Sequence, residues 1–260
     1  MQLLHADILG PGNSPALLVF HGLFGSGGNW MTLGRRLARD YAVHLIDLRN
    51  HGRSFHSSVM TLDAMGEDVA RYVAHYQLQE AYLLGHSLGG KLAMYYAINH
   101  PENVSKLVVV DISPRRYTPH HHAIFQALAG VDLCELRTRP QVEARLANYL
   151  NDLGVRQFLM KGLYRSKADK PRFKWRFNLP ALVENYGALI AELPGDRPFT
   201  KPTLFIRGEK SDYITAADTP LIQARFPNSV IETVSGVGHW LHAENPQECY
   251  QRVMSFLSAQ

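Results

Sequence analysis

A serine with a glycine two residues away on each side is the first feature that could do chemistry. Ser87 is the centre of GHSLG at 85–89, between an apolar run at 81–84 and a stretch with helical spacing at 91–99. Small residues at these positions allow the sharp strand-to-helix turn that projects a serine hydroxyl from a sheet edge. The start of the following helix also favours negative charge beside the serine. The pattern predicts a nucleophilic serine.

A serine hydroxyl is a weak nucleophile, so it needs a base, usually a histidine that a carboxylate orients. Among 13 histidines, His239 has the best placement, because it lies in the turn between the last expected strand and the final helix. Open α/β sheets collect functional groups at the carboxyl ends of their strands. His5 and His242 have no such placement. We therefore expect His239 to be the general base.

Two backbone N–H groups would be needed to stabilise the charge that develops on a substrate oxygen. One should come from Leu88, directly after the serine. The other should come from HGLFG at 21–25, in the loop after the first central strand, where Leu23 is the better candidate. Glycines in this loop let the backbone approach a substrate closely. We expect Leu23 and Leu88 to form an oxyanion hole.

The carboxylate that would orient the histidine has two main candidates. Asp111 ends an apolar run, and Asp212 follows the next expected strand. Asp47 is expected to hold its own loop, and Glu244 lies in the last loop before the final helix. The residues alone leave both Asp111 and Asp212 open.

The elements that must position these residues follow an α/β pattern. Short apolar runs alternate with longer amphipathic stretches, which is typical of a mostly parallel sheet with helices on both faces. Strands are expected at 16–20, 42–48, 81–84, 107–112, 203–207 and 230–234, and helices at 30–39, 65–75 and 91–99. A final helix should begin at Pro246, with Asn245 as its N-cap and Glu248 as the capping-box partner.

The alternation stops after residue 112 and resumes near residue 203. Residues 113–197 read as helical, aromatic and proline-rich, without a strand-like run, and hold 14 Lys and Arg against 8 Asp and Glu. An insertion between two strands of one sheet explains this better than a second domain in series. We expect an α/β core at 1–112 and 198–260 and a helical cap at 113–197.

Composition argues against several classes of protein. The 260 residues are 46% hydrophobic and carry a net charge of +4, which is too small to argue for nucleic acid. No apolar run is long enough to span a membrane, and residues 1–10 lack the features of a secretory signal. Two distant cysteines, Cys134 and Cys249, disfavour a disulfide framework, so a cytoplasmic location is expected. The glycines at 22–28 do not have the spacing of a dinucleotide site.

Several motifs together resemble the α/β-hydrolase family, and in particular the small bacterial YbfF-type esterases. They are HGLFG at 21–25, DLRNHGRS at 47–54, GHSLGG at 85–90, DISP at 111–114, WRFN at 175–178 and GHW at 238–240. The resemblance implies a carboxylesterase or thioesterase, a serine esterase with a catalytic triad, an acyl-serine intermediate and a helical cap inserted after the sixth strand. It also implies a small-molecule acyl ester or thioester substrate and no cofactor.

The choice of the acid also draws on this resemblance. The usual acid of the fold lies three residues after the glycine that ends the strand. Counting from Gly208, that position is Ser211, so Asp212 comes one residue late and should point away from the base. Asp111 ends an apolar strand, where a buried carboxylate needs a partner, and YbfF-type esterases resemble this arrangement. We expect Asp111 to be the acid and Asp212 to be the alternative.

The basic insertion predicts a preference for anionic substrates such as acyl-coenzyme A. Arg115 and Arg116 lie at its start, and His120, His121 and Trp240 are further candidates for substrate contacts. Three consecutive histidines cannot converge on one metal ion as an i,i+4 pair can, so no metal site is expected. Perhydrolysis, C–C bond hydrolysis and a non-catalytic ligand-binding module are the alternatives. No feature of the sequence addresses the oligomeric state.

Overall fold

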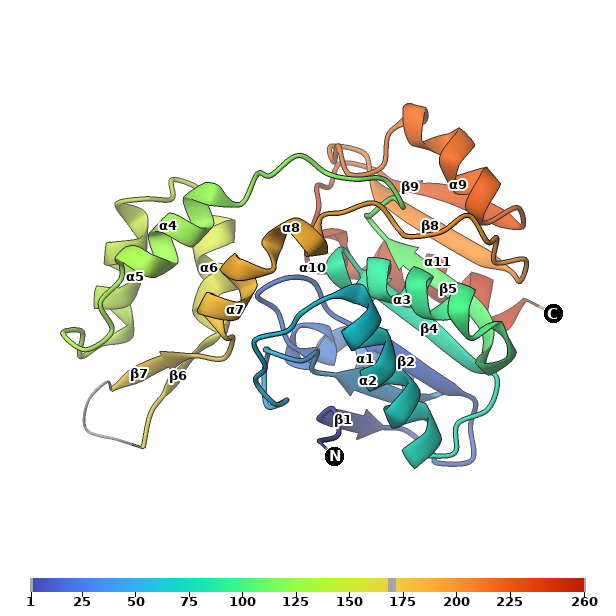
Figure 1. The fold of residues 1–260 in the computed structure, drawn as a ribbon, viewed down its shortest axis with the longest axis horizontal. Helices are drawn as coiled ribbons and strands as arrows, with labels where there is room; N and C mark the ends of the chain where they lie inside the picture. Colours follow the sequence, from blue (N-terminus) through green and yellow to red (C-terminus); the bar gives the residue numbers. More distant parts are fainter. Residues whose placement is uncertain (1, 168–171, 260) are drawn as a thin grey trace.

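The computed structural model describes residues 2–167 and 172–259 and is built around a seven-stranded sheet (Figure 1). The strands are β1 (Ala6–Leu9), β2 (Ala16–Phe20), β3 (Ala42–Ile46), β4 (Ala81–His86), β5 (Val104–Val110), β8 (Thr203–Gly208) and β9 (Ser229–Val234). Their order is β1-β3-β2-β4-β5-β8-β9, with β1 antiparallel to β3 and the other pairs parallel. The carboxyl ends of the central strands therefore meet at one edge, where open sheets carry functional groups.

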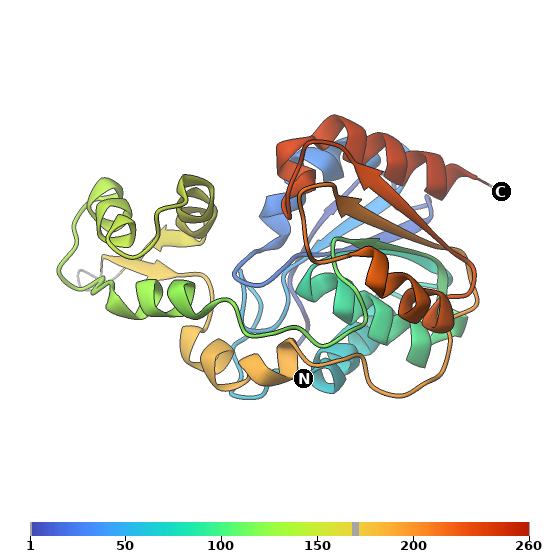
Figure 2. The same cartoon turned by 90° about the horizontal axis from the view of Figure 1, so that it is seen from above.

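Helices cover both faces of this sheet (Figure 2). One face packs against α1 (Met31–Leu37), α10 (Leu241–Glu244) and α11 (Pro246–Ser258), and the other packs against α2 (Leu62–His75), α3 (Leu88–Asn99) and α9 (Thr219–Arg225). Short 3₁₀ helices occupy Gly27–Trp30, Pro101–Asn103 and Ala216–Asp218. In β2, Leu17 and Val19 belong to one apolar layer and Leu18 and Phe20 to the other. Burial on both faces explains why central strands such as β2 read as continuous apolar runs.

The segment between β5 and β8 extends from the sheet to one side (Figure 1). It contains α4 (His122–Gly130), α5 (Arg139–Ala147), α6 (Leu153–Lys161), β6 (Leu163–Arg165), β7 (Phe173–Trp175), α7 (Leu179–Glu184) and α8 (Tyr186–Leu189). An isolated bridge between His51 and Phe177 joins it to the loop after β3. The Asn178 N–H also donates to the Asn50 carbonyl oxygen at 2.9 Å.

The expected α/β architecture, a mostly parallel sheet with helices on both faces, is confirmed. Asn245 caps α11 as expected, since its side chain accepts the Glu248 N–H at 3.2 Å. Three details differ. The antiparallel β1 was not expected, and the inserted segment holds a short β6–β7 hairpin besides its helices. The segment also follows β5, the fifth strand in chain order rather than the sixth, because residues 2–15 form one strand before β2.

Candidate active site

The turn that carries Ser87 joins β4 to α3 in a conformation that few residues tolerate. Ser87 has φ 53° and ψ −119°, and such strain costs about 1–3 kcal/mol. A Cβ on Gly85 would lie 2.2 Å from the Gly89 carbonyl oxygen, and one on Gly89 would lie 2.3 Å from that of Phe20. Only glycine fits at both positions. Close packing of β2 and β4 against the start of α3 thus holds the serine at the sheet edge.

Asp111 orients the side chain of His239. The imidazole Nδ1–H donates to Asp111 Oδ2 over 2.7 Å, and this partner assigns the tautomer. Asp111 is fully buried directly after β5, with φ 51°. Its carboxylate also accepts the Gly208 N–H at 3.0 Å and the Ser211 hydroxyl. These three donors fix the Asp111 carboxylate. The Nε2 atom of His239 takes no part in the bond to Asp111.

Further contacts fix the plane and position of this imidazole. The Tyr213 ring stacks on it with centroids 3.8 Å apart and an angle of 15° between the planes. His86 Nε2–H donates to the His239 carbonyl oxygen at 3.0 Å. A Cβ on Gly208 would lie 2.2 Å from the Gly238 carbonyl oxygen, so the turn after β8 touches the loop that carries His239. His239 is therefore held by the Asp111 side chain, by the Tyr213 ring and by contacts to its own backbone.

Burial governs the charge of both partners. It lowers the pKa of His239 from 6.5 to about 3, because a buried imidazolium loses its hydration. It raises the pKa of Asp111 to about 7, while the hydrogen bonds from Ser211 and Gly208 act in the opposite direction. The histidine is accordingly neutral at neutral pH, with its Nδ1 proton directed at the carboxylate. Its Nε2 lone pair can accept a proton.

Two cavities meet at Ser87. The first, here called the histidine cavity, has Ser87 and His239 in its wall together with His21, His86, His242, Trp30 and Trp240. The second, the tyrosine cavity, is lined by Leu88, Lys91, Ile112, Tyr117, Tyr186 and Tyr213, again with Ser87. Leu23 and His121 line both cavities. A group bound at the serine could therefore extend in two directions.

Leu23 and Leu88, the two residues expected to supply an oxyanion hole, line the tyrosine cavity together with Ser87. Leu88 is the first residue of α3, so its N–H has no acceptor within the helix. The loop of Leu23 is fixed by two buried imidazoles: His21 Nε2 accepts the Leu48 N–H at 3.0 Å, and His51 Nε2 accepts the Phe24 N–H at 3.1 Å. Burial lowers the pKa of His21 to about 4 and that of His51 to about 3. Both rings are thus neutral and able to accept these bonds.

The other proposed site residues are divided between the cavities and the surface. His120 lines the tyrosine cavity and Trp240 the histidine cavity. Arg115 lies in a separate cavity with Asp212, and its Nε is 2.8 Å from an Asp218 carboxylate oxygen. Arg116 is exposed and lines neither cavity at Ser87.

Asp212, the alternative acid, is not brought to the histidine by any hydrogen bond in the described parts of the chain. It is exposed, and its backbone carbonyl oxygen accepts a hydrogen bond from Arg115 Nη2 at 3.1 Å. The neighbouring Ser211 instead reaches Asp111.

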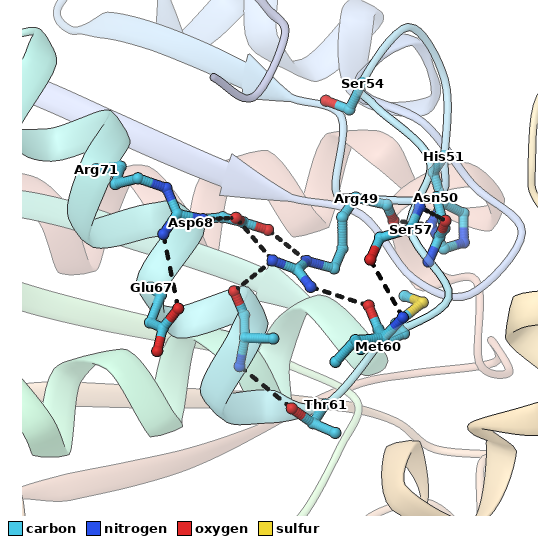
Figure 3. A network of polar contacts seen from close by, with 12 residues as sticks. Arg49, Asn50, His51, Ser54, Ser57, Met60, Thr61, Glu67, Asp68 and Arg71 are labelled. Atoms are coloured by element: carbon cyan, nitrogen blue, oxygen red, sulfur yellow. Dashed lines mark hydrogen bonds and ion pairs between the residues drawn. The ribbon is translucent and has the colours of Figure 1, made fainter. Parts of the chain in front are cut away.

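The loop after β3 is held to α2 by a network of polar contacts (Figure 3). Arg49 is buried and pairs with Asp68 of α2 through Nε at 2.5 Å and Nη2 at 2.9 Å. It also donates to the carbonyl oxygens of Val59 and Ala64, each at 2.9 Å. This network fixes the loop that carries His51. Arg49 therefore braces the loop of Leu23 indirectly.

The residues that the structure describes show neither a metal site nor a membrane span. Within ranges 2–167 and 172–259, no three His, Cys, Asp or Glu side chains are grouped so that they could hold a metal ion. No helix in these ranges is both long and apolar enough to cross a bilayer. Cys134 is exposed and Cys249 is buried, and both are free.

Sequence reasoning missed three residues that the structure brings to the site. Tyr213 stacks on the imidazole, the Ser211 hydroxyl binds Asp111, and Lys91 lines the tyrosine cavity. Ser211 lies where the fold usually has its acid, and this position could have indicated that its side chain faces the site. Lys91 and Tyr213 carry no comparable local signal.

Known proteins share this architecture across nearly the whole chain. Residues 15–246 match the family model described as alpha/beta hydrolase fold. Esterase YbfF of Escherichia coli K12 is 35% identical, covering 95% of this chain and 94% of that protein. An sn-1-specific diacylglycerol lipase of Mus musculus is also 35% identical, covering 96% and 83%. A solved structure titled marine microorganism esterase superposes with a TM-score of 0.95 at 36% identity, covering 98% and 100%. The chain therefore belongs to the α/β-hydrolase family.

Proposed function

We propose that the protein is a serine hydrolase that cleaves carboxylic esters through an acyl-serine intermediate. The observation that carries this proposal is the 2.7 Å bond from His239 Nδ1 to the buried Asp111, with the imidazole in the same cavity as Ser87. The names of the relatives, esterase YbfF and a diacylglycerol lipase, support ester chemistry. We therefore propose a carboxylesterase in preference to a thioesterase.

In the proposed mechanism His239 Nε2 takes the proton from the Ser87 hydroxyl as Oγ attacks the ester carbonyl carbon. Asp111 stabilises the imidazolium that forms and keeps the ring in its tautomer. The N–H groups of Leu23 and Leu88 bind the oxygen of the tetrahedral intermediate. One such donor is worth roughly 10²–10³ in kcat. The imidazolium then protonates the departing alcohol, and Ser87 is left acylated.

The acyl-serine is hydrolysed by the same groups in reverse roles. His239 takes a proton from a water molecule, which attacks the acyl carbonyl, and returns that proton to Ser87 Oγ. The carboxylic acid leaves and the free serine is restored. Apart from the ester and the attacking water molecule, no further proton donor or acceptor is needed in either half of the reaction.

We also propose that residues 113–197 act as a cap that shapes the substrate site, with the core at 1–112 and 198–260. Ile124 and Phe158 from this segment line the histidine cavity. Tyr117 and Tyr186 from the same segment line the tyrosine cavity. Substrate selection would then depend on the cap, while the chemistry depends on the core.

The proposal is tested with p-nitrophenyl butyrate and a serine-directed phosphonate. Wild-type protein should release p-nitrophenol and gain the mass of the phosphonate on the peptide containing Ser87. Ser87→Ala should reduce turnover to below about 1% of wild type, because loss of a triad member removes several orders of magnitude. It should also lose the label while keeping the wild-type circular dichroism.

The matched control is Ser258→Ala, whose hydroxyl caps the Met254 carbonyl oxygen at the end of α11. It should keep both turnover and labelling. Ester turnover that survives Ser87→Ala would refute Ser87 as the nucleophile. A wild-type protein with neither turnover nor label would instead be a ligand-binding module.

A further inference from the structure

Lys91 is a lysine in the protein interior, one helical turn after the serine. Lys91 is 1% exposed, and its backbone N–H donates to the Ser87 carbonyl oxygen at 3.0 Å. Nζ donates to the Arg115 carbonyl oxygen at 2.9 Å and also to that of Ala191. Arg115 lies in the linker that leaves β5, and Ala191 lies in the linker that leads to β8. One ammonium thus joins both linkers beside the nucleophile.

The charge of this ammonium lacks a counterion within salt-bridge distance in the described parts of the chain. Two N–H groups bind the two carbonyls, while an ammonium has three donors. Arg115 and Arg116 add positive potential, and Glu192 opposes it. Burial, with these arginines, lowers the pKa of Lys91 to about 7. A buried cation is costly unless it is paired, so the site favours an anionic ligand.

This cation lines the same cavity as the nucleophile. Lys91, Ser87 and Leu88 are all in the wall of the tyrosine cavity. Most of the remaining wall is aliphatic or aromatic, including Ile112 and Leu189, and no Asp or Glu of the described chain lines it. A chain bound at the serine would meet an apolar wall that contains one cationic side chain.

We infer that Lys91 selects substrates whose acyl group ends in a carboxylate, such as half-esters of short dicarboxylic acids. The inference rests on the proposed function, since Ser87 must hold the ester carbonyl. The aliphatic wall contacts the methylenes, and the third N–H of the ammonium donates to the carboxylate, which supplies the missing counterion. Arg115 does not fill this role, because Asp218 pairs with it outside the cavity.

The test compares ethyl hydrogen glutarate and ethyl hydrogen adipate with ethyl pentanoate and ethyl hexanoate, which have the same chain lengths without the carboxylate. The readout is the ratio of kcat/KM for the charged ester to that for its neutral match. Wild type should prefer one charged ester, and Lys91→Met should lower that ratio at least tenfold. Lys91→Gln should lower it too, and it serves if the methionine variant fails to fold. A merely structural role would affect both esters alike.

The matched control is Lys106→Met, because Lys106 Nζ also donates to backbone carbonyls, those of Phe256 at 3.2 Å and Leu257 at 3.0 Å, but lines neither cavity at Ser87. Its ratio should equal that of wild type. A wild-type preference for the neutral esters, or a ratio unchanged in both Lys91 variants, would overturn the inference.

Calorimetric binding of glutarate and pentanamide, a neutral molecule of the same chain length, separates this inference from the proposed function. Glutarate should bind wild type at least tenfold more tightly than it binds Lys91→Met, whereas pentanamide should bind the two proteins equally. If wild type hydrolysed none of the esters, the proposed function would fail, and the glutarate result would still decide the role of Lys91. Equal glutarate affinity in both proteins would refute that role.

Discussion

The contacts of Asp111 explain how a carboxylate after β5 can orient His239 in place of one after the neighbouring β8. β5 and β8 are paired, so Asp111 and the turn after Gly208 end at nearby points of the sheet edge. Ser211 is in that turn, where this fold usually has its acid, and its hydroxyl donates to the Asp111 carboxylate. The serine thus supports a carboxylate that reaches the histidine from the adjacent strand.

A pair of single substitutions tests this assignment. Asp111→Asn should lower kcat for p-nitrophenyl butyrate by several orders of magnitude. The reason is that an amide at this position can hold the imidazole of His239 in the wrong tautomer. Asp212→Asn should lower it less than about tenfold, since Asp212 is exposed and contacts Arg115 only through its carbonyl oxygen. Steady-state kinetics with far-UV dichroism as the folding control decide between them. The opposite pattern would return the acid to Asp212.

Sequence patterns identify residues with strong local signals and miss those defined by distant contacts. Ser87 and His239 stand in short motifs between recognisable elements, so they could be singled out from the sequence. Lys91 could not, because a lysine in a helix ordinarily suggests an exposed side chain. Its burial depends on carbonyl groups at Arg115 and Ala191, 24 and 100 residues away. No window of sequence contains that information.

At the scale of elements, length and apolar content together decided which strands were predicted. The parallel strands β2, β3, β4, β5, β8 and β9 have five to seven residues, and each contains at least three apolar residues, as in Ala16–Phe20. β6 and β7 have three residues each, and β1 has four with only partly buried or exposed positions. Such short, half-polar strands give no clear periodicity, and their pairing is set by tertiary contacts.

The Arg49–Asp68 pair gives a prediction about the contact between α2 and the loop after β3 (Figure 3). Asp68→Asn should reduce the free energy of unfolding by about 3–5 kcal/mol, because it leaves the buried Arg49 guanidinium without its countercharge. Urea titration followed by tryptophan fluorescence measures this change.

The neighbouring Glu67 is the matched control for that experiment. It pairs with Arg71, as Asp68 does, but its side chain is 71% exposed and the distance is 3.6 Å. Glu67→Gln should therefore change the free energy of unfolding by less than about 1 kcal/mol. If the two substitutions lowered the free energy of unfolding equally, the buried Arg49–Asp68 pair would contribute no more to stability than an exposed ion pair.

At the scale of the molecule, the positive charge of the inserted segment is unevenly placed. Arg165 and Lys174 are exposed on the β6–β7 hairpin, which Figure 1 shows at the end of the segment away from the sheet. This charge lies outside both cavities at Ser87, because neither residue is in their walls. It can raise the local concentration of large anions over the molecule, and salt weakens such long-range effects. The hairpin charge would thus attract anionic substrates at long range, whereas Lys91 would select among them inside the tyrosine cavity.

Salt dependence tests whether the hairpin charge increases kcat/KM for acyl-coenzyme A, a thioester that the proposed triad could also cleave. The kcat/KM for butyryl-coenzyme A should fall several-fold between about 20 and 300 mM NaCl, whereas that for p-nitrophenyl butyrate should stay nearly constant. Replacing Arg165 and Lys174 by Gln should flatten the first dependence without changing the second. The control replaces Arg35 and Arg39, two exposed arginines in and just after α1, by Gln. Identical salt responses of the two substrates would mean that the hairpin charge is only solvated and plays no part in catalysis.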